Sequence, residues 1–578
     1  MKEKLQDALF SAVRQVLDAA DDAGEVPAFA LELPKRADHG DFACNAAMLL
    51  AKRLGEPPRA IAERLAAALG DAAGLVERSE IAGPGFLNIW LSAARWQALM
   101  RTVLELGPRY GHSKQGDGRR VQVEFVSANP TGPLTLGHGR QGVLGDVLAR
   151  LLEASGFEVT REYYFNNGGR QMRVLGESVR ARALEQLGRA AAPPPEMFEA
   201  DESDWPTEID GLPVLFPRDG YQGGYIAVLA EEARARHGDV LDDAALGGDA
   251  CRVLAQEHIF EDIRATLERM DIHFDVYSNE MDLYEEGKVE AVLQDLRETG
   301  NVYDADGAVW LRATALGLER DRVLVKSSGE PTYLLPDLAY HREKFRRGFD
   351  RVIDVQGADH IEQFPYVCAG VGALGCPAER IELLMNQFVT LTRGGEQVKQ
   401  STRKATYVTV DELIADVGRD VFRFFMIQRK AEGHLDFDLD VAESTDWKKN
   451  PAYTVQYAHA RTHGIERQAA EQGVPMPNAQ SVEAAELVLP EEIELLKKVA
   501  EFPAVVARAA ESREPHHVAY YAREVAGLWN PYVQDRKRHR VLSEDASLTS
   551  GRLGLTLAVR GVLANALALL GLSAPERM

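Results

Sequence analysis

Three glycines and one histidine fall within nine residues, GPLTLGHGR, at 132–140. An ordered glycine costs conformational entropy, so such a cluster is typical of a backbone that another group approaches closely. The preceding run VQVEFVSA predicts a buried strand over 121–128, and the following QGVLGDVLARLLEASG predicts a helix that stops at Gly156. A glycine-rich turn between strand and helix presents N–H groups that can bind a phosphate. The alternative is a tight turn without a ligand.

The chain that contains this turn is long and acidic. Its 578 residues exceed what one hydrophobic core supports, so we expect three or four domains. The net charge of −23 excludes a generic DNA-coating protein. The four cysteines lack zinc-ligand spacing, predict no metal site and fit a reducing compartment. The apolar run LGLTLAVRGVLANALALLGL contains Arg560 and Asn565, which favours a core helix over a membrane span.

The pattern along the chain predicts three regions. Residues 1–110 indicate a small N-terminal α+β domain. Residues 118–440 alternate strand-like and helix-like runs, which predicts an α/β domain with a doubly wound, Rossmann-like parallel sheet. Its candidate strands are VQVEFVS, EVTREYYF, VWLRAT, DRVIDVQG and ELLMNQFVTL. An insertion is expected around 165–300, with a proline-rich, acidic surface excursion over 190–248. Residues 441–578 predict an all-helical C-terminal domain.

Several segments, in one order along the chain, carry a family resemblance. Thr135-Leu136-Gly137-His138 resembles the first signature of class I aminoacyl-tRNA synthetases, usually His-x-Gly-His, and SANPTGPLTLGHGR is similar to arginyl-tRNA synthetases in particular. Further similar segments are YYFNNGGRQMRVLGESV, VLVKSSGEPTYLLPDLAYHREKF, VQGADHIEQF, NPAYTVQYAHAR and, in the N-terminal domain, EIAGPGFLNIWL. Two departures stand out: Thr135 replaces the first histidine, and the second signature, usually Lys-Met-Ser-Lys-Ser, reads KQSTR at 399–403.

The resemblance implies an arginine–tRNA ligase that uses ATP and Mg²⁺. Attack of a carboxylate on the α-phosphate builds negative charge on phosphate oxygens, so catalysis needs positioning and positive electrostatics. The catalytic residues implied are His138, Thr135, Lys399 and Arg403, with Arg403 or Lys404 standing in for the missing second lysine. The ATP-binding residues implied are Gly137, Gly139, Asp359, His360 and Ser401.

An arginine pocket needs carboxylates, because the guanidinium presents a planar fork that a carboxylate meets bidentately. The family motifs place Glu124 and Asp337 in that role, with Tyr333 closing over the guanidinium plane. Ser127 and Asn129 would orient the α-amino and carboxylate groups. The alternative for Glu124 is a structural ion pair at the end of a strand.

The second partner implied is tRNA(Arg), beside L-arginine. The helical domain corresponds to the anticodon-binding domain of the family, and its expected RNA contacts are Tyr453, Tyr457, His459 and Arg461. We expect a cytoplasmic monomer that binds neither DNA nor membrane. Two alternatives stay open at this point. One is a class I ligase for another amino acid, and the other is a degenerate paralogue that binds tRNA without catalysis, suggested by Thr135 and Thr402.

Overall fold

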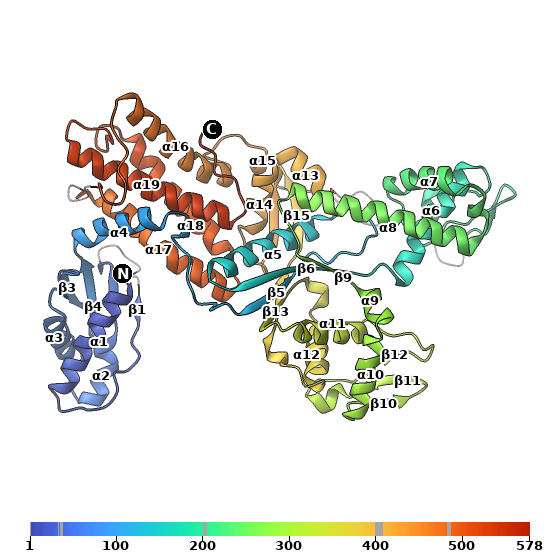
Figure 1. Ribbon diagram of the computed structural model, residues 1–578, viewed down its shortest axis with the longest axis horizontal. Helices are drawn as coiled ribbons and strands as arrows, with labels where there is room; N and C mark the ends of the chain where they lie inside the picture. Colours follow the sequence, from blue (N-terminus) through green and yellow to red (C-terminus); the bar gives the residue numbers. More distant parts are fainter. Residues whose placement is uncertain (1, 33, 35–38, 200–204, 399–407, 483–486) are drawn as a thin grey trace.

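The computed structural model describes residues 2–32, 34, 39–199, 205–398, 408–482 and 487–578 (Figure 1). The molecule is elongated, with the N-terminal domain near one end and a helical insertion at the other. The parallel sheet lies between them, and the C-terminal helices pack above it in the same view.

The N-terminal domain is a four-stranded antiparallel sheet covered by helices. Its strand order is β1-β2-β4-β3. The domain comprises α1 (Lys2–Asp18), β1 (Leu31–Glu32), β2 (Phe42–Cys44), α2 (Ala46–Leu54), α3 (Pro58–Leu69), β3 (Val76–Ala82) and β4 (Phe86–Leu91). The next helix, α4 (Ala93–Leu106), packs against helices of the C-terminal domain and so connects the two ends of the chain.

The central sheet has five parallel strands in the order β14-β13-β5-β6-β9. They are β5 (Arg120–Glu124), β6 (Glu158–Phe165), β9 (Val276–Asn279), β13 (Arg351–Gly357) and β14 (Ile381–Asn386). Successive strand residues point to opposite faces, and both faces are covered. Ile353 packs in one core with α5 (Leu136–Ala154), whereas Val352 packs in another with α11 (Leu334–Arg346) and α12 (Phe364–Ala373). The predicted doubly wound fold is confirmed.

One of the predicted strands lies outside this sheet, and another lies only partly within it. VWLRAT contributes β11 (Ala308–Leu311), which pairs antiparallel with β10 (Val302–Ala305) and β12 (Arg322–Val325) in a separate sheet. The physical reason is the Asp306-Gly307 turn, where both residues have positive φ, as a tight hairpin requires. ELLMNQFVTL divides into β14 and β15 (Val389–Arg393), and β15 joins β16 (Glu396–Gln397) and β17 (Leu435–Asp438) in a third sheet.

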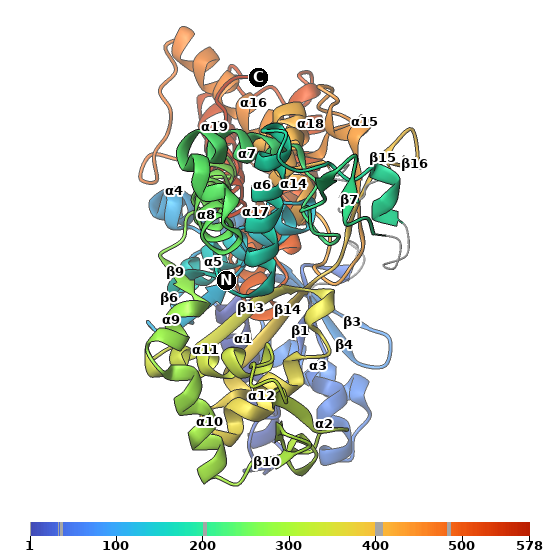
Figure 2. The ribbon, with the colours of Figure 1, turned by 90° about the vertical axis from the view of Figure 1, so that its right-hand side faces the viewer.

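The insertion between β6 and β9 is a packed helical module. Helices α6 (Gly169–Gln186), α7 (Gly224–His237) and α8 (Ala244–Arg269) lie side by side (Figure 2). Residues 190–248 were expected to be a surface excursion, but Leu229, Ala230 and Ala233 of α7 are buried against the neighbouring helices. The module also holds β7 (Glu208–Ile209) and β8 (Leu212–Pro213). After β9 the chain continues into α9 (Glu280–Glu285) and α10 (Lys288–Glu298).

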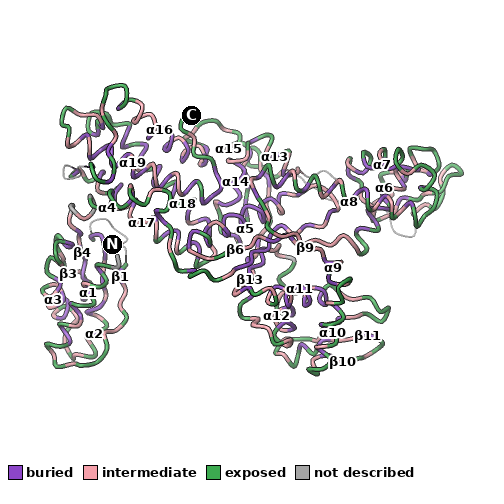
Figure 3. Tube along the Cα trace, in the orientation of Figure 1, coloured by how far each residue is buried: buried purple, intermediate pink, exposed green. Residues whose placement is uncertain are grey.

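The C-terminal domain is helical, as predicted. Helices α13 (Val410–Val417), α14 (Arg419–Ile427) and α15 (Leu439–Ala442) lead from the sheets into α16 (Pro451–Glu471), α17 (Pro490–Ser512), α18 (His516–Gln534) and α19 (Ala546–Leu569). Helix α19 is long and apolar enough to cross a membrane, but 67% of its most apolar window is buried inside the protein (Figure 3). That burial is typical of a core helix.

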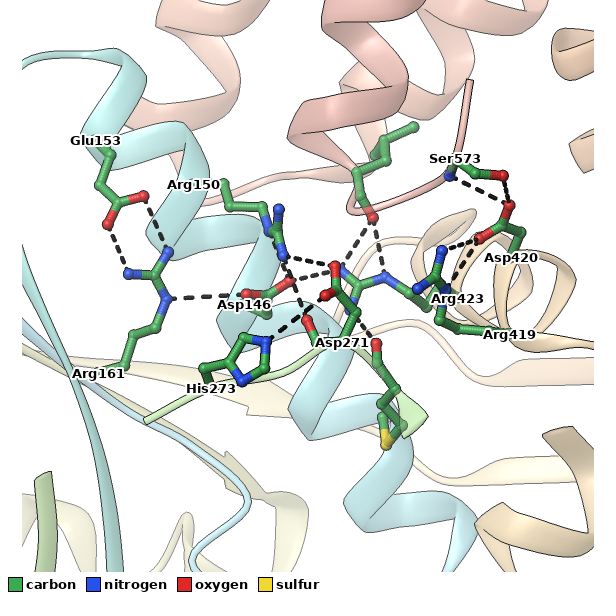
Figure 4. A network of polar contacts seen from close by, with 12 residues as sticks. Asp146, Arg150, Glu153, Arg161, Asp271, His273, Arg419, Asp420, Arg423 and Ser573 are labelled. Carbon is green, nitrogen blue, oxygen red and sulfur yellow. Dashed lines mark hydrogen bonds and ion pairs between the residues drawn. The ribbon is translucent and has the colours of Figure 1, made fainter. Parts of the chain in front are cut away.

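A buried arginine ties the end of α19 to α5 and to the end of α8 (Figure 4). Arg423 of α14 donates to the Asp146 carboxylate on α5, to the Leu570 carbonyl after α19 and, at 2.8 Å, to the Met270 carbonyl after α8. A Cβ atom at Gly571 would collide with the guanidinium, so glycine is required there. One fully buried side chain therefore joins three helices that are far apart in the sequence.

Candidate active site

The first signature lies at the amino end of α5, as predicted. Thr135 is the N-cap residue, and its backbone N–H donates to His138 Nδ1 at 3.3 Å. Thr135 Oγ1 lies 3.2 Å from the same ring nitrogen. A neutral imidazole that accepts at Nδ1 carries its proton at Nε2, the form that can donate to an anion. The threonine that replaces the usual histidine therefore also fixes the ring of His138 and caps the helix.

The two glycines of the signature have different surroundings. A Cβ atom at Gly139 would lie 2.8 Å from Phe422 Cζ and 2.9 Å from Val410 Cγ2, so this glycine allows α5 to pack closely on α13 and α14. Among the described residues, a Cβ atom at Gly137 would meet only Thr135 Oγ1, at 3.7 Å. Packing therefore accounts for Gly139 but not for Gly137, and the predicted nucleotide contact is better suited to Gly137.

The loop after β5 begins with two residues in left-handed conformation. Val126 has φ 67° and Ser127 has φ 43°. Such backbone costs about 1–3 kcal/mol per residue and persists only where neighbouring groups hold it. Ser127 Oγ donates to Glu124 Oε1 at 2.9 Å and accepts from the Tyr164 N–H at 3.2 Å. The turn thus directs Ser127 back onto Glu124, and the two predicted arginine-binding residues lie in direct contact.

Glu124 also takes part in a buried ion pair. Lys344 Nζ of α11 donates to Glu124 Oε2 at 2.6 Å and to Asp354 Oδ1 at 2.7 Å. Glu124 and Asp354 are register partners on β5 and β13, so one ammonium bridges the two neighbouring strands. The structural alternative considered for Glu124 is therefore present, and it coexists with the contact to Ser127.

Helix α11 supplies the second side of the cluster. Asp337, His341 and Lys344 are spaced i, i+4 and i+7, which places them on one helix face. His341 Nδ1 lies 2.8 Å from the Asp337 carbonyl, and His341 Nε2 lies 2.8 Å from Asp354 Oδ2. Both partners are hydrogen-bond acceptors, so the His341 ring links α11 to β13. Burial raises the pKa of Asp354, but Lys344 and His341 outweigh it and leave that pKa below its usual range.

Asp337 itself lies close to two other carboxyl groups. Burial raises the pKa of its carboxyl to about 7; His341 opposes the shift, and Glu280 and Glu124 add to it. Gln363 Nε2 donates to Asp337 Oδ2 at 2.6 Å. Glu280, from the start of α9, is also buried, and burial raises its pKa as well. This cluster of three neighbouring carboxyl groups is suited to a cationic ligand.

Sequence reasoning missed four members of this cluster, which are Lys344, His341, Glu280 and the β13 residue Asp354. Lys344 and His341 had a usable signal, since their spacing from Asp337 places all three on one face of a helix. Glu280 had none, because it is remote in sequence from both predicted carboxylates and reaches them through the return of the chain as β9, the sheet edge. Its carboxylate accepts from Tyr164 Oη at 3.0 Å and from Asn166 Nδ2 at 2.7 Å.

The other predicted site residues have varied surroundings. Tyr333 is 69% exposed at the start of α11 and does not cover the pocket. Asn129 Oδ1 accepts from the Asn166 N–H at 2.9 Å, and Asn129 Nδ2 donates to Gln171 Oε1 at 2.9 Å. Asp359 and His360 form a short 3-10 turn directly after β13, with His360 exposed. Lys399, Ser401 and Arg403 lie outside the described residues.

The four residues predicted to bind RNA lie on α16. The Tyr457 ring stacks on Trp447 with a centroid distance of 4.6 Å, and the Arg461 guanidinium lies 5.5 Å from the Tyr457 ring. His459 is 3% exposed and its Nδ1 lies 2.9 Å from the Pro575 carbonyl, which gives it a packing role. Tyr453 lines a cavity of about 540 Å³ between α14, α16 and the C-terminal segment. The stacked pair is the part best suited to a base.

Three family models match consecutive parts of the chain. They are the arginyl tRNA synthetase N terminal domain over residues 3–91, the catalytic domain of tRNA synthetases class I (R) over 100–430, and the DALR anticodon binding domain over 455–578. Together with the parallel sheet and its signature helix, they define a class I aminoacyl-tRNA synthetase.

Whole-chain relatives narrow the assignment. The arginine–tRNA ligase of Desulfotalea psychrophila is 48% identical over 95% of both chains. The crystal structure of a putative arginyl-tRNA synthetase from Campylobacter jejuni superimposes with a TM-score of 0.72 at 27% identity, covering 84% of this chain and all of the other. The Thermus thermophilus arginyl-tRNA synthetase shares the fold, with a TM-score of 0.71, 24% identity and coverage of 99% and 100%. The chain belongs to the arginyl-tRNA synthetase family.

Proposed function

We propose how this arginine–tRNA ligase recognises and activates its amino acid. The observation that carries the proposal is the cluster of three carboxyl groups, Asp337, Glu280 and Glu124, in which burial and mutual repulsion raise the pKa of Asp337 to about 7. An arginine guanidinium supplies a positive charge. Its fixed fork can meet the Asp337 carboxylate bidentately, which the point charge of lysine cannot reproduce.

The rest of the amino acid is held at the loop after β5. Ser127 and Asn129 face the α-amino and carboxylate groups in this proposal, and the left-handed turn at Val126 and Ser127 keeps them at the edge of the pocket. Tyr333 swings from its exposed position over the guanidinium plane once the ligand is bound. The ion pair of Glu124 with Lys344 holds the Glu124 carboxylate in place.

ATP binds at the amino end of α5, as the Mg²⁺ complex. This ion keeps several waters and binds chiefly through phosphate oxygens, so it arrives with the substrate. An oxygen of the arginine carboxylate attacks the α-phosphorus, the bond to the leaving diphosphate breaks, and arginyl-adenylate forms. His138 Nε2–H and the Thr135 hydroxyl donate to the phosphate oxygens as their charge grows. Lys399, Ser401 and Arg403 are proposed to hold the diphosphate.

The arginyl group then passes to the terminal adenosine of tRNA(Arg), at the 2′-hydroxyl in this class. We place anticodon contacts at Tyr457 and Trp447, where a stacked aromatic pair with Lys448 beside it offers a platform for bases. The described cysteines are free thiols, in keeping with a cytoplasmic location. A monomer is the expected state of the enzyme, to be checked by light scattering.

Aminoacylation of total tRNA with each radiolabelled amino acid tests the proposal. Product is expected with arginine alone. Product with another amino acid would contradict the assigned pocket, and no product with any of them would contradict catalysis itself. The Asp337→Asn variant is then expected to raise the arginine KM strongly, because it removes the carboxylate that takes the guanidinium fork.

A further inference from the structure

The helical insertion touches the signature loop directly. Helix α6 begins just after Asn166 and holds the Asn129 side chain through two hydrogen bonds, one to the Asn166 N–H and one to Gln171. Helix α7 reaches the same loop from another side. Tyr225 Oη donates to the Thr131 carbonyl at 2.7 Å. The loop between β5 and α5 is therefore held by two helices of a module that comes later in the chain.

The contact of Tyr225 is also a close packing contact. A Cβ atom at Gly132 would lie 3.0 Å from Tyr225 Oη and 3.3 Å from Tyr225 Cζ. The glycine next to Thr131 therefore leaves just enough space for the phenol. The missing side chain at Gly132 and the hydroxyl of Tyr225 are therefore complementary, and we call this the fitted contact.

Tyr225 is held rigidly on its own side. It is the second residue of α7, whose next residue, Ile226, is buried, as is Leu229 one turn further on. The segment that leads into the helix is fixed to α6, because the Tyr221 N–H donates to Ser178 Oγ at 3.0 Å. A phenol carried on such a scaffold can fix the position of the loop that it contacts.

We propose that Tyr225 is a positioning residue for the activation step, acting through the Thr131 carbonyl. The loop begins in the strained left-handed turn at Val126 and Ser127 and ends at Thr135, four residues after Thr131. Tyr225 holds the middle of this loop. It thereby keeps Ser127 and Asn129, at one end of the loop, at a fixed position relative to Thr135 and His138. The proposal rests on the proposed function of those loop residues.

The test begins with Tyr225→Phe, which removes only the hydroxyl. We expect kcat for arginylation to fall about three- to tenfold, the value of one lost hydrogen bond, while the KM values for tRNA and ATP stay within twofold. The matched control is Tyr303→Phe, which removes a hydroxyl bonded to Asp321 at 3.0 Å in the separate β10–β12 sheet and leaves kcat unchanged. A Tyr225→Phe enzyme with wild-type kcat would overturn the proposal. A fall in kcat that merely tracks a lowered melting temperature would do the same.

A double-mutant cycle with Gly132→Ala tests the fitted contact itself. The added methyl group meets Tyr225 Oη, so its effect on kcat is expected to be smaller in the Tyr225→Phe background than in the wild type. Additive effects would refute coupling between the two residues. This result can be distinguished from a failure of the arginine assignment. If Asp337→Asn leaves the arginine KM unchanged but the cycle is non-additive, then Asp337 does not bind the guanidinium, whereas Tyr225 still positions the loop.

Discussion

Lys344 Nζ and Glu124 Oε2 lie 2.6 Å apart, with the ammonium fully buried and the carboxylate 4% exposed. Burial lowers the pKa of Lys344, but Asp354 and Glu124 more than compensate and leave it raised, so the lysine stays charged. This permanent internal cation bridges the two strand carboxylates and offsets one of their two charges, whereas Asp337 on the same helix face is left to its ligand.

Removing this internal cation should lower the free energy of unfolding. Lys344→Met leaves Glu124 and Asp354 buried with one ammonium fewer, which is expected to cost about 3–5 kcal/mol of the free energy of unfolding. Urea denaturation followed by circular dichroism measures it. Lys326→Met is the matched control, because Lys326 is exposed and pairs with Glu330 at 3.4 Å, a contact worth about 0–1 kcal/mol. Equal effects of the two substitutions would contradict the role given to Lys344.

Arginine affinity should depend on pH through Asp337. Its carboxyl has a pKa of about 7 in the empty pocket and must be ionised to bind the guanidinium. Below pH 7 the affinity is therefore expected to fall by up to about tenfold per pH unit, and above pH 8 it should level off. Equilibrium dialysis with labelled arginine between pH 5.5 and 8.5 measures the profile. Asp337→Asn should bind weakly with no inflection near pH 7; a profile in that variant like the wild type would assign the titration to another group.

The same carboxyl should cost stability when no ligand is present. In the unfolded chain Asp337 ionises near its ordinary value of 3.8, but in the folded state it ionises near 7. The unfolded state thus holds fewer protons between these values, so this group's contribution to stability is lost as pH rises through 7. Asp337→Asn is expected to melt above the wild type at pH 8, with a smaller difference at pH 5. Scanning calorimetry at both pH values decides it, and a lower melting temperature at pH 8 would contradict the raised pKa of Asp337.

Local patterns predicted the central fold well, and the site in part. The glycine-rich turn, the helix that follows it and the parallel sheet follow from periodicity and turn chemistry within short windows. The run VWLRAT was misplaced because a short apolar strand has the same pattern in a parallel sheet and in a hairpin. The dipeptide Asp306-Gly307 before it was the signal that distinguishes them.

Some residues of the candidate site could not be predicted without knowledge of the tertiary structure. Asp337 and Glu124 could be placed from motifs, and Lys344 from helical spacing. Glu280 and Tyr225 could not, because each reaches the site from the insertion region through helix packing and strand order, which no local window encodes. Gly139 illustrates the converse: its place in a signature suggested a nucleotide, whereas its neighbours make it a packing glycine.

The two signature glycines should respond differently to alanine. Gly139→Ala pushes a methyl group into Phe422 and Val410, so we expect a loss of about 1–3 kcal/mol in stability. Gly137→Ala makes only an ordinary contact with Thr135 Oγ1 among the described residues and gains helix propensity, worth about 0.5–1 kcal/mol. It should nevertheless raise the KM for ATP if the nucleotide lies against this backbone. Thermal melts and ATP kinetics on the two variants test this pair. Equal melting temperatures would contradict the packing difference, and an unchanged KM in Gly137→Ala would remove the nucleotide from that position.

Substitutions at Thr135 and His138 should distinguish helix capping, which affects stability, from catalysis, which affects kcat. His138→Ala removes a donor to the phosphate oxygens, which is expected to lower kcat about 100- to 1000-fold. Thr135→Ala removes the N-cap hydroxyl, at a cost of about 1 kcal/mol in stability, and leaves His138 Nδ1 with the contact to the residue 135 N–H but not with the hydroxyl. Thr135→Ser keeps both contacts and should restore kcat. His434→Ala, at an exposed histidine bonded to Thr390, serves as the control with wild-type kcat. If His138→Ala retained most of its activity, the phosphate donor would have to be sought on another element. If Thr135→Ser failed to rescue, the hydroxyl could not be what orients the ring.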